Sequence, residues 1–228
     1  MKFVCNTHLL LKFRKIQDTV VEVDKGIKFT SKSGLKVWLI NLYSVKARIQ
    51  IMLGDTNGAE DSIGRAEEIA SDMKAVTQNL GELALSKLCI DLYLLEESNG
   101  RNDKVASSMQ KIISLKAGKY ARKMAAKLSI MRTEAWKLMG LCFWLIGKQK
   151  KAIKWWHKAI LDGQHLNNRL ELSRTYFEVG KRLLEPTSKT KELNGITAEE
   201  YLEKARVMFT EMDLQWDLDE LDKVMATR

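Results

Sequence analysis

The stretch that decides the fold is WKLMGLCFWLIGKQKKAIKWWHKA, residues 136–159. Its large and small residues recur three and four positions apart, and this spacing puts side chains on one face of an α-helix. Gly140 falls where a second helix can approach closely, and Gly147 separates the two periodic segments. The stretch therefore predicts two antiparallel helices joined by a tight turn, with large side chains filling the space that small residues leave.

The same offsets recur elsewhere, which indicates an internal repeat. One copy surrounds the turn at residues 54–58, and another begins at Arg169, where an insertion of about 20 residues displaces the second helix. We therefore expect one domain over residues 1–228. Its predicted parts are an incomplete first unit (1–34), four repeats (35–70, 77–116, 120–163 and 165–213) and a terminal helix (214–228).

The unit at residues 136–159 resembles the tetratricopeptide repeat (TPR), which has a large residue, Leu-Gly and an aromatic on its first helix, and Ala, an aromatic and Ala on its second. The resemblance implies an all-α fold, an α-solenoid of stacked antiparallel helix pairs wound into a right-handed superhelix. The last third, from residue 169 through 198–205 to 213–218, also resembles the C-terminal repeat tail of large bacterial signalling proteins. Those proteins join a predicted ATPase to a nucleotide cyclase or kinase domain.

In TPR arrays the first helix of each pair lines a concave groove, so the resemblance implies which offsets face a partner. Asparagine and arginine recur at equal offsets in two units, and they suit a peptide backbone and a carboxylate. The alternative is an ordinary polar helix face. The predicted partner-binding residues are Asn41, Arg48, Lys137, Trp144, Asn167, Arg174 and Phe177.

Positive charge is concentrated in the middle of the chain. The formal net charge is +9, and residues 101–160 hold 15 lysines and arginines against two acids. This basic block is either a solvated helix surface or a docking face for an acidic protein or a nucleic acid. Its densest part is a basic patch of Lys148, Lys150, Lys151, Lys154 and Lys158.

No motif for catalysis stands out. The chain has neither glycine-rich phosphate-binding signature, and its three histidines and three cysteines lack metal-ligand spacing. We therefore expect no catalytic residues, no metal and no cofactor. The scattered cysteines fit a reducing cytoplasm, and the longest apolar stretches fall short of the roughly 20 residues that span a membrane.

These features leave three functions open. The first is a protein-protein interaction scaffold whose groove binds an acidic protein or peptide segment. The second is nucleic-acid or acidic-partner binding through residues 101–160. The third is a regulatory tail for a bacterial signalling ATPase or cyclase.

Overall fold

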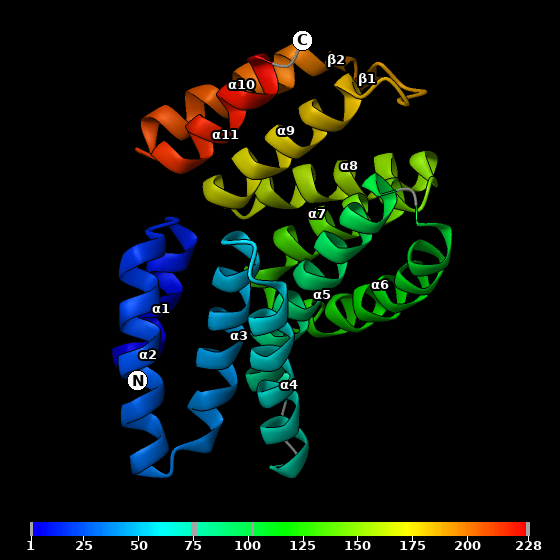
Figure 1. Cartoon of the computed structure of the whole chain (residues 1–228). Helices are drawn as coiled ribbons and strands as arrows, with labels where there is room; N and C mark the ends of the chain where they lie inside the picture. Colours follow the sequence, from blue (N-terminus) through cyan, green and yellow to red (C-terminus); the bar gives the residue numbers. More distant parts are fainter. Residues whose placement is uncertain (1, 74–76, 102, 227–228) are drawn as a thin grey trace. The chain divides into compact units, whose positions relative to one another are not determined.

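The computed structural model describes residues 2–73, 77–101 and 103–226, and within these ranges the chain is almost entirely helical (Figure 1). The described residues form eleven α-helices and one short β-hairpin. Consecutive helices pack in pairs, so the predicted all-α class with a helical-repeat arrangement is confirmed. None of the described helices is both long enough and apolar enough to cross a membrane.

The chain divides into two compact units, Met1–Leu128 and Ser129–Arg228, and the single domain over residues 1–228 stays a prediction. The boundary falls inside the repeat expected at residues 120–163. This difference in repeat bounds arises because the helix before the boundary runs on to Ala125 and the next begins only at Ser129.

In the first unit each helix packs against the next one in the chain. The first helix of each helix pair also packs against the first helix of the next pair. The chain begins with two helices, and the first of them buries Val4 and Leu11, so a helix pair stands where an incomplete unit was predicted for residues 1–34. The bounds are α1 (Lys2–Lys12), α2 (Ile16–Ser33), α3 (Lys36–Met52), α4 (Thr56–Asp72), α5 (Thr77–Gly100) and α6 (Lys104–Ala125).

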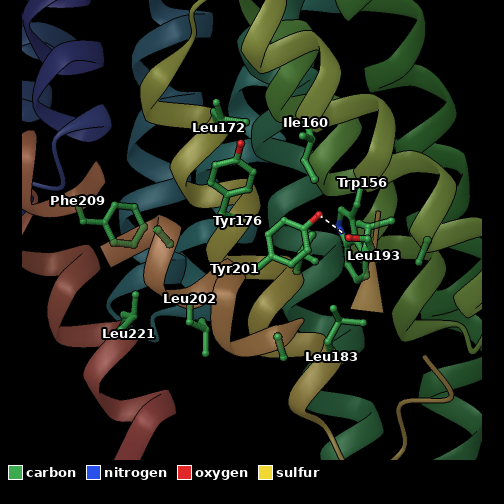
Figure 2. Close-up of a cluster of buried hydrophobic side chains, with 14 of the residues drawn as sticks. Trp156, Ile160, Leu172, Tyr176, Leu183, Leu193, Tyr201, Leu202, Phe209 and Leu221 are labelled. Carbon is green, nitrogen blue, oxygen red and sulfur yellow. Dashed lines mark hydrogen bonds between the residues drawn. The ribbon is translucent and has the colours of Figure 1, made fainter. Parts of the chain in front are cut away.

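The second unit repeats this packing around one continuous hydrophobic core (Figure 2). Trp156 and Phe209 are fully buried in it, and the rings of Tyr176 and Tyr201 lie 5.6 Å apart between centroids. The bounds are α7 (Ser129–Leu145), α8 (Gln149–His165), α9 (Arg169–Leu184), β1 (Glu192–Leu193), β2 (Ile196–Thr197), α10 (Ala198–Glu211) and α11 (Gln215–Ala226).

The close helix approach predicted at Gly140 is present between α7 and α8. A β-carbon at Gly140 would overlap the indole ring of Trp156. That indole also donates a hydrogen bond from Nε1 to the Lys137 carbonyl oxygen at 3.2 Å, which ties α8 to α7. The small residue is therefore needed for the packing of this pair.

The insertion between α9 and α10 folds back onto the core. Asn194 and Gly195 take left-handed backbone angles, φ 56° and 72°, and form the turn between β1 and β2. The Tyr201 hydroxyl donates to the Leu193 carbonyl oxygen at 3.0 Å (Figure 2). A capping box starts α10, because Thr197 and Glu200 exchange side-chain and backbone hydrogen bonds there.

Candidate partner-binding site

Several charged residues on the first helices of the pairs bind one another. In the first unit, Glu82 of α5 is 2% exposed and lies between two cations, with His8 Nε2 at 2.7 Å and Arg48 Nη1 at 3.2 Å. Burial alone would raise the pKa of Glu82, but the charge and hydrogen bond of His8, helped by Arg48, hold that pKa far below its usual range. In turn, the Glu82 carboxylate raises the pKa of His8.

The second unit has the same kind of pairing between neighbouring repeats. Lys137 Nζ of α7 lies 2.8 Å from Glu171 Oε2 of α9. Arg174 of α9 donates two hydrogen bonds to Asp217 of α11, at 2.9 Å from Nε and 2.7 Å from Nη2. These carboxylates neutralise the cations that the TPR resemblance assigned to a partner.

Trp144 and Phe177 are also engaged within the unit. Trp144 is 5% exposed, where an open groove position was expected, because its Nε1 donates to Glu185 Oε2 at 2.7 Å and its ring packs on Trp156. Phe177 is half-buried and meets Phe209 edge-on, with ring centroids 6.2 Å apart.

The two predicted asparagines differ from each other. Asn41 is half-buried on α3, whereas Asn167 is exposed and lies outside α9, in a turn with φ 50°.

Repeat offsets locate the inner face of a helix, but they do not show which charged side chains pair between neighbouring repeats. Partner binding by the seven groove residues therefore stays a prediction, and five of them are held by neighbours in the same unit.

The basic patch has a different environment. All five of its lysines are exposed, because α8 turns Ala152, Trp156, Ala159 and Ile160 toward the core. No carboxylate in the described part of the chain pairs with any of them. By contrast, Arg132 of the same basic block is bound to Asp162 at 2.7 Å. We call Lys148, Lys150, Lys151, Lys154 and Lys158 the α8 lysine face.

The structure adds a lysine that the sequence pattern missed. Gln149 Nε2 donates to the Thr187 carbonyl oxygen at 3.0 Å, and the Lys189 backbone N–H donates to Gln149 Oε1 at 2.9 Å. These bonds hold the inserted loop at the first turn of α8. A cleft of about 560 Å³ results, lined by residues 147–151 together with Lys189 and Thr190.

Aromatic side chains near the α8 lysine face are committed to contacts within the unit. Trp156 is fully buried, and Trp155 is half-buried with Lys158 Nζ 5.0 Å from its ring centroid. In the residues described, no group of three or more His, Cys, Asp or Glu side chains could hold a metal ion. Because its five lysines are exposed and no described carboxylate pairs with them, the α8 lysine face is a surface suited to binding anions.

Comparison of the chain with protein-family models and with curated proteins gives no match.

Proposed function

We propose that this protein is a non-catalytic interaction scaffold that binds an acidic protein segment on the α8 lysine face. The observation that supports this most is the set of five exposed lysines, four on α8 and Lys148 at its N-cap, with no carboxylate partner in the described ranges. Because α8 is packed into the core, the charges are held on a rigid element and their field attracts an acidic partner.

An acidic protein suits this surface better than a nucleic acid does. Binding of single strands relies on aromatic rings on which bases stack, each worth about 1–3 kcal/mol. Trp156 is buried, and Lys158 lies over the ring of Trp155. Phosphate attraction alone would give weak binding that depends steeply on salt.

The proposal extends to a cellular context through the resemblance of the last third of the chain to signalling tails. In that context the protein acts in the bacterial cytoplasm, and the acidic segment belongs to an ATPase, cyclase or kinase domain that the scaffold regulates. The sequence feature behind this extension is the run from Arg169 to Arg182 with the segments at 198–205 and 213–218.

Charge reversal on the α8 lysine face tests the proposal. The probe is a fluorescein-labelled peptide of about ten glutamates, titrated by fluorescence anisotropy. Replacing Lys154 and Lys158 by glutamate should weaken binding by at least about tenfold, or 1.4 kcal/mol, because attraction becomes repulsion at two positions.

The matched control is the pair Lys28→Glu and Lys32→Glu on α2, two exposed lysines outside the surface. The control should bind the probe nearly as well as the parent. Equal weakening by both pairs would show only a net-charge effect and would reject the α8 lysine face.

A further inference from the structure

We propose that the cleft at the first turn of α8 binds a phosphomonoester, specifically a phosphorylated serine or threonine within the acidic segment. The proposal rests on the proposed function, because it assigns one subsite within the same surface. We call this subsite the lysine cleft; it is lined by residues 147–151, Lys189 and Thr190.

Four lysines from two parts of the chain line the lysine cleft. Lys150 and Lys151 come from the first turn of α8, Lys148 is its N-cap residue, and Lys189 comes from the inserted loop. No acidic residue lines the cleft, and no described carboxylate pairs with these lysines. A phosphomonoester carries nearly two negative charges and three strong acceptor oxygens, so it can use several of these donors where a carboxylate uses fewer.

The concave shape is held in place before any ligand arrives. Besides the two bonds of Gln149, the Ser188 side chain is 8% exposed and its Oγ donates to the Thr190 carbonyl oxygen at 2.6 Å. The loop backbone that carries Lys189 is therefore fixed against α8. A prepositioned loop avoids the entropy cost of ordering it on binding, which favours affinity for a small group.

The backbone of α8 adds donors at the same place. The Lys151 and Ala152 N–H groups bond to the Lys148 carbonyl oxygen at 2.8 and 3.1 Å. The N–H groups of Gln149 and Lys150 have no acceptor within the described ranges, and Lys148 makes no side-chain cap. These two amides point along the helix axis, where the dipole also favours an anion.

The test compares two peptides that differ by one phosphate. One fluorescein-labelled peptide has a central phosphoserine flanked by about five glutamates on each side, and the other has serine there. The full chain should bind the phosphopeptide about tenfold more tightly at pH 7.5. Lowering the pH to 5 should reduce the preference, because the phosphate then carries one charge instead of two.

The cleft variant replaces Lys148 and Lys189 by glutamine, and the control replaces Lys191 and Lys204, which are exposed and outside the cleft. The preference for phosphoserine should fall below about threefold in the cleft variant and persist in the control. Circular dichroism verifies that both variants keep the helical content of the parent.

The possible failures are distinguishable. If the parent binds both peptides equally, or if the cleft variant keeps the full preference, the phosphate subsite is rejected while the acidic-segment proposal stands. If neither peptide binds, both proposals fail. If an oligothymidylate displaces the phosphopeptide as well as unlabelled phosphopeptide does, the cleft recognises phosphodiesters and the phosphoprotein assignment is overturned.

Discussion

Arg174 and Asp217 form a bidentate ion pair that joins α9 to α11, with N–O distances of 2.9 and 2.7 Å. The two residues are only 6% and 3% exposed. Removing one partner leaves the other charge buried, which typically costs about 3–5 kcal/mol. We therefore expect Asp217→Ala to lower the free energy of unfolding by that amount in urea denaturation.

The double variant Arg174→Met with Asp217→Leu separates the charge effect from loss of packing. Because both charges of the pair are removed, it should recover part of the lost stability, to an extent limited by Glu171 and Glu134, whose charges also act on Arg174. A double variant as unstable as Asp217→Ala would contradict this view of the pair.

A second prediction concerns the contact between Gly140 and Trp156. Gly140→Ala places a methyl group into the indole ring, and overpacking of this kind costs about 1–3 kcal/mol. Gly64→Ala is the control, because Gly64 is exposed on α4 and a β-carbon there meets nothing within 4 Å. That control should stabilise its helix by about 0.5–1 kcal/mol, and thermal melts followed by circular dichroism compare the two.

The third prediction is a pH dependence from His8. Its pKa is raised in the folded state, chiefly by the Glu82 carboxylate, against the opposing effects of burial, Lys12 and Arg48. The stabilisation is complete below the unfolded pKa of about 6.5 and is lost as pH rises through the folded value. His8→Gln should therefore be most destabilising near pH 6 and least near pH 9, measured as unfolding free energies relative to the parent.

The fourth prediction concerns Asp91 on α5, which is 7% exposed and whose Oδ2 has no hydrogen-bond partner among the described residues. Burial raises the pKa of Asp91 to about 6, although Lys87 and Gln110 oppose the shift. Between about pH 4 and 6 the folded state then holds a proton that the unfolded chain has released. Stability should thus fall by roughly 1–3 kcal/mol as pH rises through this window.

Asp91→Asn removes the titrating group and should flatten that part of the stability curve. The comparison depends on the slope with pH, so any constant cost of burying the amide does not affect it. An unchanged slope between pH 4 and 6 would show that Asp91 is ionised in the folded protein throughout.

The sequence was sufficient for the helix pairs and for the Gly140 contact, because both depend on periodicity within about 20 residues. It was insufficient for the ion pairs. Arg174 and Asp217 are 43 residues apart and belong to different repeats, so no local pattern links them. For the same reason, the position of Arg174 at a groove offset predicted a cation available to a binding partner. In the structure Arg174 is bound instead to the buried Asp217.

The basic surface was predicted in part. Charge counting identified the α8 lysine face, since five lysines lie within 11 residues and the intervening apolar residues show which side is buried. Lys189 could not be assigned to it, because its position depends on two hydrogen bonds between Gln149 and a loop 40 residues away. The repeat expected at residues 120–163 begins inside α6, because that helix continues past residue 116, the expected end of its own repeat.

We expect the α8 lysine face to bind an acidic protein segment in preference to nucleic acid, and parallel titrations at two salt concentrations test this most directly. The labelled glutamate peptide and a labelled oligothymidylate of similar charge are titrated with the full chain at about 50 and 200 mM salt, the range in which phosphate contacts weaken strongly. We predict that the oligonucleotide binds only at the lower salt, whereas peptide binding persists at the higher salt and is lost with Lys154→Glu and Lys158→Glu. Saturable oligonucleotide binding at 200 mM salt, abolished by the same two substitutions, would contradict the account.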